Sequence, residues 1–299
     1  MHRAAASLVE LLVTIAVIGV LMGLLLGAIQ KVRAASARID CGNRQKQLTL
    51  AMLSYHDAEN RLPGLGNGRV LSERFPYLGW IAKLLPFLEQ ESLARRTDED
   101  YSKRRDPFLR LNPHRNLAHV LPAAGCPADD RMTRSWIATA KHDKLTIALS
   151  SYLGNSGTNS RTLDGVIYRN SRTQLLHISD GTTNTILLGE RPPSPDVLFG
   201  WWYAGAGVRD TGVLDFVLNS REQNLRPPYA WYRRCDDGPY HFQARTLDDY
   251  CGVFHYWSLH SGGANFAFCD GSVRFLRYEA DAVLPALMTR AGGEVVAVE

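Results

Sequence analysis

The chain has 299 residues, of which 45% are hydrophobic and 21% are charged, and this balance excludes wholesale disorder. Lysine and arginine total 34 against 30 aspartate and glutamate, so the formal net charge is +4. Over this length, and without a clustered basic face, such a charge does not indicate nucleic acid as a partner. The 25 glycines and 14 prolines favour one or two turn-rich domains over a helical bundle.

The first element in the chain is an apolar segment of membrane-spanning length at residues 8–29, LVELLVTIAVIGVLMGLLLGAI. A secretory signal peptide is the alternative, but its apolar region is usually shorter and ends at a small-residue cleavage site. Here the segment continues without a break towards residue 60. The sequence therefore predicts one helix over residues 6–60, transmembrane over 8–29 and amphipathic over 30–60.

Glu10 is the one charged residue of the apolar segment. An ionised carboxylate within hydrocarbon costs about 2.5 to 3.5 kcal/mol on insertion scales, so such a residue usually marks a function or a partner. The alternative is that Glu10 lies at the membrane interface and reaches water there.

The segment Ala5-Ala6-Ser7-Leu8-Val9-Glu10-Leu11-Leu12-Val13 resembles the amino terminus of type IV prepilins and type II secretion pseudopilins. In that family Gly and Phe flank the cleavage site, where this chain has Ala5 and Ala6. The resemblance implies that a prepilin peptidase removes residues 1–5 as a leader and methylates the new amine of Ala6. It also implies that Glu10 pairs with the amino-terminal charge of a neighbouring pilin-like subunit during assembly.

Two arguments about the orientation in the inner membrane disagree. Basic residues are more frequent after the span than before it, and a positive-inside count would place the carboxy-terminal part in the cytoplasm. The prepilin resemblance implies a cytoplasmic amino terminus and a periplasmic or extracellular head. We adopt the second orientation, because the basic residues belong to a continuing amphipathic helix: Lys31, Arg33, Arg38, Arg44 and Lys46.

The second half of the predicted helix carries one apolar stripe that can pack against a head domain. Its members recur at spacings of three and four: Ile39, Leu48, Ala51, Met52 and Tyr55. Pro63 and Gly64 end the helix, so the head is expected to occupy residues 61–299.

The head is predicted to be α+β, with a mainly antiparallel sheet packed on the long helix. A short apolar helix is expected over Trp80–Leu85, interrupted at Pro86, and the charge-rich residues 95–115 are expected to form a solvated face or loop. Four short runs have β-type composition between glycines. These runs are Ser151–Gly154, Val166–Tyr168, Thr185–Gly189 and Phe199–Tyr203.

A hairpin is predicted around Asp270-Gly271, a pair that favours a two-residue type I′ turn. That turn would place Phe268 opposite Val273 and Phe266 opposite Phe275, so that these four side chains share one core face. His260 precedes the hairpin, close enough to hydrogen-bond back to the sheet.

The spacing His260-x9-Asp270-Gly271 resembles the carboxy-terminal motif of a large bacterial family of uncharacterised proteins with prepilin-type amino termini. The resemblance covers nearly the whole chain and implies family membership but no biochemical role for these residues, so that the hairpin geometry alone gives the motif a structural interpretation. Further matching segments occur in the same order: Cys41–Leu48, Trp80–Gln90, Cys126–Asp129, Ser151–Thr158 and Ile178–Arg191.

No catalytic motif stands out, since the chain lacks Gly-x-Ser-x-Gly, His-Glu-x-x-His and P-loop patterns. His260, Asp270 and Ser261 could form a hydrolase triad, but hairpin geometry explains Asp270. We therefore expect no enzyme.

No cofactor or metal is expected either, with two alternatives. Zinc could be held by residues crowded near the carboxy terminus, although they form no Cys-x2-Cys pair: Cys235, His241, Cys251, His255, His260 and Cys269. Calcium could be held at Asp236-Asp237-Gly238 or Asp248-Asp249.

The sequence thus predicts a membrane-anchored structural subunit, pseudopilin-like, of a type II secretion or type IV pilus-like system. Its expected partners are prepilin peptidase, other pilin-like subunits and inner-membrane lipid. The main alternative is an anchored periplasmic binding module that does not polymerise and holds carbohydrate or peptide on its aromatic-rich region: Trp201, Trp202, Tyr203, Tyr229, Trp231 and Tyr232. An anchored enzyme is a third reading.

Five cysteines outside the cytoplasm allow two disulfides and leave one thiol. Cys235 and Cys251 bracket a short loop and are predicted to pair. Cys41 is predicted to pair with Cys126, which would join the helix to the head, and Cys269 is then left as a small buried hydrophobic residue.

Overall fold

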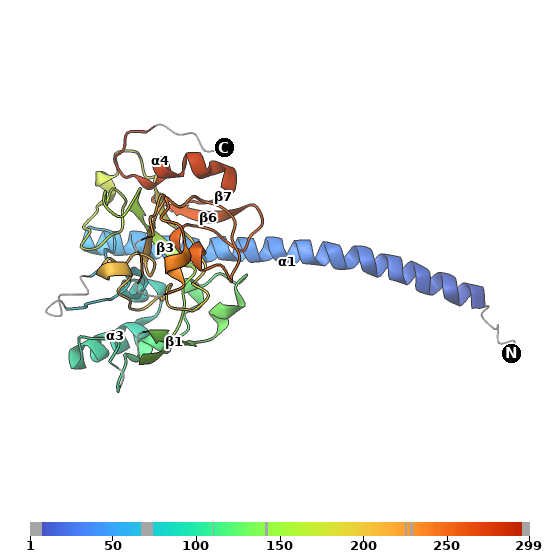
Figure 1. Cartoon of the computed structure of the whole chain (residues 1–299), viewed down its shortest axis with the longest axis horizontal. Coiled ribbons are helices and arrows are strands. Elements are labelled where there is room, and N and C mark those ends of the chain that lie inside the picture. Colours follow the sequence, from blue (N-terminus) through green and yellow to red (C-terminus); the bar gives the residue numbers. More distant parts are fainter. Residues whose placement is uncertain are drawn as a thin grey trace.

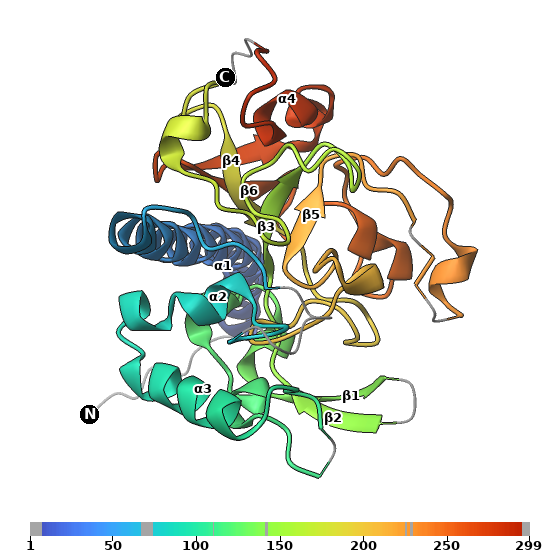
Figure 2. The same ribbon diagram turned by 90° about the vertical axis from the view of Figure 1, so that its left-hand side faces the viewer.

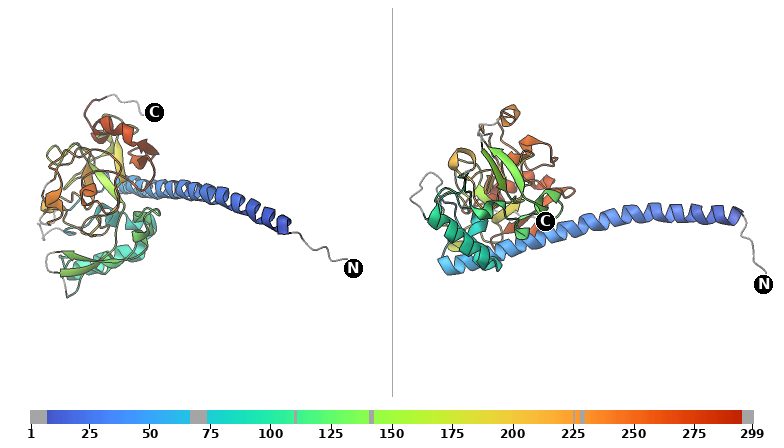
Figure 3. Two further views of the ribbon diagram at one scale, coloured as in Figure 1. Left: turned by 45° about the vertical axis from the view of Figure 1, so that its right-hand side comes forward. Right: turned by 90° about the horizontal axis from the view of Figure 1, so that it is seen from below.

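A long helix carries a compact head in the computed structural model, which describes residues 8–66, 74–109, 111–140, 143–224, 226–227 and 230–294. Helix α1 spans Leu8–Glu59 and projects far beyond the head on its amino-terminal side (Figure 1). It curves gently along its length, which is clearest in the side view of Figure 3. The continuous helix predicted from the apolar segment is present throughout its described part.

The two halves of α1 have different surroundings. No described residue before Cys41, from Leu8 onward, is buried, whereas Leu48, Ala51 and Met52 are buried in the head, as the predicted stripe requires. The expectation for Ile39 was wrong, because its side chain is 60% exposed. At about 100° per residue, Ile39 lies roughly 200° around the helix from Cys41 and so faces away from the head.

The other helices are short. They are α2 (Trp80–Lys83), α3 (Glu91–Lys103) and α4 (Leu284–Met288). Short 3-10 turns lie at Leu85–Leu88 (η1), Arg115–Ala118 (η2), Pro122–Ala124 (η3), Asp130–Thr133 (η4), Leu175–His177 (η5), Val208–Asp210 (η6), Tyr232–Arg234 (η7), Tyr250–Phe254 (η8) and Tyr278–Ala282 (η9).

These helices confirm one expectation and correct another. The apolar helix predicted at Trp80 forms as α2, which ends at Lys83. Pro86 lies in the first turn of η1, where its missing N–H is tolerated. The charge-rich segment is not simply a loop, because α3 runs into it. Asp100 of α3 is buried and holds Arg115 by an ion pair of 2.9 Å, so part of this charge is structural.

A five-stranded mixed sheet forms the centre of the head. Its order is β5 (Val217–Asn219), β3 (Tyr152–Gly157), β4 (Ile186–Glu190), β6 (Gly263–Phe268) and β7 (Val273–Arg277). The β3–β5 pair is parallel and the other pairs are antiparallel. A separate antiparallel hairpin joins β1 (Trp136–Ala140) and β2 (Asp143–Ile147). The predicted α+β class is confirmed.

Two of the predicted β-type runs are not strands. Val166–Tyr168 and Phe199–Tyr203 lie outside the named strands, although most of their side chains are buried. Trp201 makes only an isolated bridge to Leu149. The apolar, β-branched and aromatic composition of these two runs therefore predicted correctly that they are buried, but not whether they pair as strands in a sheet.

The predicted hairpin register was wrong by one residue. Gly271 is at φ 88° and its N–H donates to the carbonyl of Phe268 (2.9 Å), which gives a three-residue loop instead of a type I′ pair. Ala267 therefore lies opposite Val273, and Phe266 opposite Arg274. The predicted grouping of four apolar side chains is lost.

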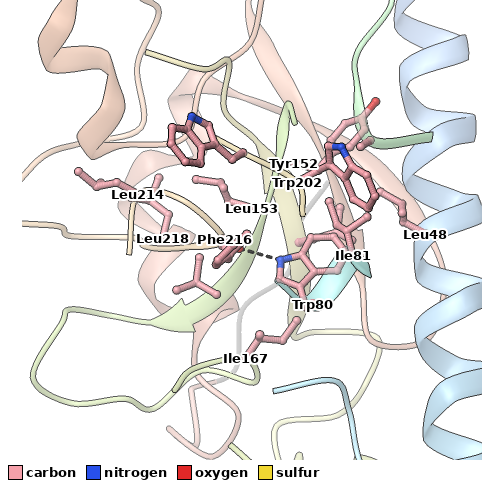
Figure 4. Close-up of a cluster of buried hydrophobic side chains, with 14 of the residues drawn as sticks. Leu48, Trp80, Ile81, Tyr152, Leu153, Ile167, Trp202, Leu214, Phe216 and Leu218 are labelled. Carbon is pink, nitrogen blue, oxygen red and sulfur yellow. Dashed lines mark hydrogen bonds between the residues drawn. The ribbon is translucent and has the colours of Figure 1, made fainter. Parts of the chain in front are cut away.

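Helix α1 packs beside the sheet and contacts β4, β6 and β7, as the view along the helix in Figure 2 shows. Val273 of β7 approaches Gly42 of α1, where an added Cβ would be 3.7 Å from its methyl group. Leu48 joins a buried cluster with Trp80 and other head residues (Figure 4). In that cluster the Trp80 indole donates to the carbonyl of Phe216 at 2.8 Å.

Candidate functional site

Four side chains that can bind metals meet where α1 enters the head. Cys41 lies on α1, Cys126 follows η3, Glu190 ends β4 and His260 precedes β6. All four residues are buried, and their ligating atoms lie within 4.8 Å of one another. We call this group the Cys-Cys-Glu-His cluster.

The cluster is connected by direct contacts. Cys126 Sγ lies 3.5 Å from His260 Nε2, and the same nitrogen lies 3.4 Å from Glu190 Oε1. The thiol of Cys41 donates a short hydrogen bond to Glu190 Oε1. One carboxylate oxygen is therefore shared between the helix and the head.

A second layer of hydrogen bonds fixes the groups on the helix side. The backbone N–H of Asn265 donates to Glu190 Oε2 at 2.7 Å, and its side-chain amide donates to Oε1 at 3.1 Å. The hydroxyl of Tyr152 lies 3.2 Å from Cys41 Sγ. Since Glu190 and Tyr152 are themselves fully buried, these contacts hold the ligating atoms in one arrangement.

Two serines fix the backbone on the head side. The N–H of Cys126 donates to Ser151 Oγ (3.1 Å), and the N–H of His260 donates to Ser258 Oγ (3.0 Å). A cavity of about 10 Å³ lies beside the cluster, lined by both serines, Cys126 and Glu190 among others. It has room for about one water molecule and for nothing larger.

The contacts within the cluster shift the pKa values of its groups in different directions. Burial, helped by the hydrogen bond to Cys126, raises the pKa of the Cys41 thiol. The hydrogen bond from Cys41 outweighs burial at Cys126 and lowers the pKa of that thiol from 9.0 to about 7. Burial disfavours the imidazolium of His260, but contacts with Cys126 and Glu190 raise its pKa from 6.5 to about 9. At neutral pH an imidazolium thus lies beside acidic partners.

The predicted disulfide between Cys41 and Cys126 is absent, although the two residues lie close together as the prediction required. Both residues are free thiols in the structure. They are close together, but each sulfur is also engaged by a further group, Cys41 by Glu190 and Cys126 by His260. These contacts could not be predicted from the sequence, because Glu190 and His260 are distant in the chain from both cysteines and from each other.

The other cysteine predictions are confirmed. Cys235 and Cys251 form a disulfide with their Cα atoms 5.6 Å apart. Cys269 is a buried free thiol, and burial raises its pKa.

The residues of the predicted His260-x9-Asp270-Gly271 motif lie in two separate places. His260 belongs to the cluster, whereas Asp270 and Gly271 lie at the far end of β6. Asp270 accepts the N–H of Ser272 (2.8 Å), and the carbonyl of Gly271 accepts the Lys46 ammonium (2.5 Å). His260 and Asp270 therefore do not form the pair that the triad would need.

The metal alternatives weighed from the sequence are arranged differently. Cys235 and Cys251 are bonded to each other and cannot ligate zinc, and of that set only His260 reaches the cluster. At the calcium candidates, Asp237 pairs with Arg226 (3.0 Å) and Asp249 pairs with Arg245 (3.0 Å).

The aromatic region proposed for ligand binding is mostly core. Trp201, Trp202, Tyr203 and Tyr232 are buried, and Trp231 is half-exposed. Tyr229 lies outside the described residues.

The apolar half of α1 is a second candidate for a functional surface. α1 is the one helix of the described part that is long and apolar enough to cross a membrane, and its apolar window is not buried. Ala5 and Ala6, the predicted processing site, lie outside the described residues, and Glu10 lies in the first turn of α1. The helix also carries Gly19, Gly23 and Gly27 at four-residue intervals, a signal visible in the sequence, with open space where each Cβ would stand.

A family described as "Protein of unknown function (DUF1559)" matches residues 30–282, which include all four members of the Cys-Cys-Glu-His cluster. No curated protein and no solved structure matches the chain.

Proposed function

We propose that this chain, which belongs to the DUF1559 family, is a pilin-like subunit that is anchored in the inner membrane by α1 and assembles with other pilin-like subunits. One observation carries the proposal: the amino-terminal half of α1 is apolar, is not buried and projects away from a folded head (Figure 1). An exposed apolar surface of this length needs lipid or protein around it.

The orientation we propose places the head in the periplasm or outside the cell. The Cys235–Cys251 disulfide favours an oxidising compartment. The basic residues after the span, which argued for the opposite orientation, are used by the head. Arg44 donates to the carbonyls of Pro122 and Gly125 (2.8 and 2.6 Å), and Arg38 lies over the ring of Phe275. Contacts with the head therefore account for Arg38 and Arg44, and these two basic residues need not indicate a cytoplasmic location.

Assembly through the helix is supported by two features of the span. Glu10 is an acidic residue that hydrocarbon disfavours, and a positive amino terminus from a neighbouring subunit would compensate it. Gly19, Gly23 and Gly27 lie along one face, and small residues at four-residue spacing let transmembrane helices approach closely. Cleavage between Ala5 and Ala6 by a prepilin peptidase would create the amino terminus that Glu10 needs.

A non-polymerising binding module is the less favoured alternative. It needed exposed aromatic rings, and Trp201, Trp202, Tyr203 and Tyr232 are occupied in the core.

The test is photo-crosslinking in native membranes, with a photo-reactive amino acid at Leu21, which is 53% exposed on the span. We expect a ladder of multimers from the wild type and loss of the ladder in Glu10→Ala, while both remain in the membrane fraction. Thr14→Ala is the matched control, because the Thr14 hydroxyl already donates to the carbonyl of Leu11 within the helix (2.7 Å). Mass spectrometry of the mature amino terminus tests the processing step.

A wild-type chain that crosslinks only to lipid would refute assembly and favour the binding module. A ladder that is equally strong in Glu10→Ala and Thr14→Ala would remove Glu10 from the assembly mechanism. A mature protein that begins at Met1 would contradict processing.

A further inference from the structure

We propose that the Cys-Cys-Glu-His cluster is a structural zinc site, in which Cys41, Cys126, Glu190 and His260 bind one Zn²⁺ ion. This inference is independent of assembly, because all four ligands come from a single chain.

The donor set and its spacing suit zinc. Two thiolates, one imidazole nitrogen and one carboxylate oxygen are ligand types that zinc binds in four-coordinate tetrahedral sites. For such bond lengths, a tetrahedron separates S from N by about 3.6 Å and N from O by about 3.4 Å. Cys126 Sγ lies 3.5 Å from His260 Nε2, and that nitrogen lies 3.4 Å from Glu190 Oε1. The short Cys41–Glu190 contact would open when the thiol proton leaves.

The cluster can supply negative charge to a cation once its thiols lose their protons. A thiol pair and a carboxylate are buried together, and the imidazole of His260 is the one basic side chain among the described residues that contacts them. Buried acidic groups are usually paired or coordinate metals, because burying an unpaired charge is costly. Binding of Zn²⁺ would release the thiol protons and the second imidazole proton and give each ligand its coordinating form.

The surroundings indicate a structural role for the metal. Asn265 orients the Glu190 carboxylate through two hydrogen bonds, as outer-layer partners of metal ligands do. Four protein ligands close the coordination shell, and the adjoining cavity of about 10 Å³ admits no substrate. The ion would tie α1 to three separate segments of the head, at Cys126, β4 and the start of β6.

The test uses the full-length chain, purified in detergent with chelator-treated buffers and thiol reductant. Zinc is measured by elemental analysis after loading and dialysis, and Co²⁺ titration reports the ligands through its thiolate charge-transfer and tetrahedral visible bands. We expect one zinc per chain, and a cobalt spectrum of a tetrahedral site with two thiolates.

The variants compare cysteines inside and outside the cluster. Cys126→Ser should weaken zinc binding by more than about 100-fold, beyond what loss of an outer-layer partner costs. Cys269→Ser is the matched control, since Cys269 is also a buried free thiol but lies outside the cluster, and it should bind zinc as the wild type does. Retention of the Cys235–Cys251 disulfide, mapped in a sample of each variant prepared without reductant, reports that the head has folded.

Three results would overturn the proposal. One is a wild-type chain that takes up no cobalt into a thiolate site. Another is equal zinc binding by Cys126→Ser and Cys269→Ser. The third is peptide mapping, without reductant, of protein isolated from cell envelopes that finds Cys41 bonded to Cys126, since a disulfide and a dithiolate zinc site exclude each other.

Discussion

Leu48→Ala should destabilise the head strongly, because Leu48 is a fully buried residue through which α1 contributes to the apolar core. Its side chain is 0% exposed and lies in the buried cluster with Trp80, Ile81 and Tyr152 (Figure 4). Truncation to alanine removes the transfer free energy of the lost carbons and leaves a cavity between a rigid helix and the sheet. Such substitutions cost about 2 to 5 kcal/mol, and we expect the upper half of this range because neither wall can collapse easily.

The same helix supplies the control. Leu50 follows two residues later, but its side chain is 49% exposed. Full burial of a leucine side chain stabilises a protein by about 1.5 to 3 kcal/mol. Since Leu50 is only half-buried, we expect Leu50→Ala to lower the free energy of unfolding by about 1 kcal/mol. The two variants have the same composition change and the same helix propensity change, and they should differ by at least about 2 kcal/mol.

The assay is urea unfolding of the full-length chain in detergent, followed by tryptophan fluorescence. All six tryptophans lie between residues 80 and 257, so the signal reports on the head alone. We expect a lower midpoint for Leu48→Ala at an unchanged slope, which is the signature of lost stability without a changed unfolded state. Equal midpoints for the two variants would refute the claim that α1 is an integral part of the head's core.

Two further predictions concern buried groups of the head. Burial raises the pKa of the Glu222 carboxyl from 4.5 to about 7, so ionisation of this group should cost the wild type stability as the pH rises from about 4.5 through 7. Glu222→Gln lacks this contribution, so its stability relative to the wild type should rise by about 3 kcal/mol between pH 4 and pH 8. Parallel pH profiles of the two unfolding midpoints would contradict this. Loss of the Cys235–Cys251 disulfide by replacement of both residues with serine should cost about 3 kcal/mol, since the bond closes a loop with a sequence separation of 16; an unfolding midpoint equal to that of the wild type would show that the loop is constrained without the bond.

Much of the fold could be predicted from local pattern. Helix α1 and the strand at Tyr152 follow from composition and periodicity, which need no long-range information. The hairpin register could not, because Asp270-Gly271 suits both a type I′ turn and a three-residue loop with glycine at positive φ. Helix α3 was missed because charge dominates its sequence, although Leu93 and Tyr101 are buried on one face.

The candidate site was harder to predict, for a topological reason. Its ligands come from α1, the loop after η3, the end of β4 and the start of β6, and only the folded sheet brings these segments together. The cysteine count did indicate that Cys41 and Cys126 are neighbours. Glu190 had a weaker signal, a lone charge that ends an apolar strand, and nothing in the sequence connected it to His260.

The position of the cluster on α1 would suit the anchored subunit that we propose. Cys41 is the first buried residue of the helix, and at 1.5 Å per residue it lies about 46 Å from Glu10. A pivot of about 6° at Cys41 would therefore move Glu10 by about 5 Å, close to one helical turn, and would spoil any pairing with a neighbouring subunit. Apolar packing deeper in the head, around Leu48 and Met52, resists separation but is non-directional. Directional contacts are concentrated at the entry point instead, where Cys41 bonds Glu190 and Gln45 donates to the carbonyl of Asn265 (3.0 Å). A metal ion bound by Cys41 would add a further directional contact at this point, where a small rotation of α1 causes the largest displacement of Glu10.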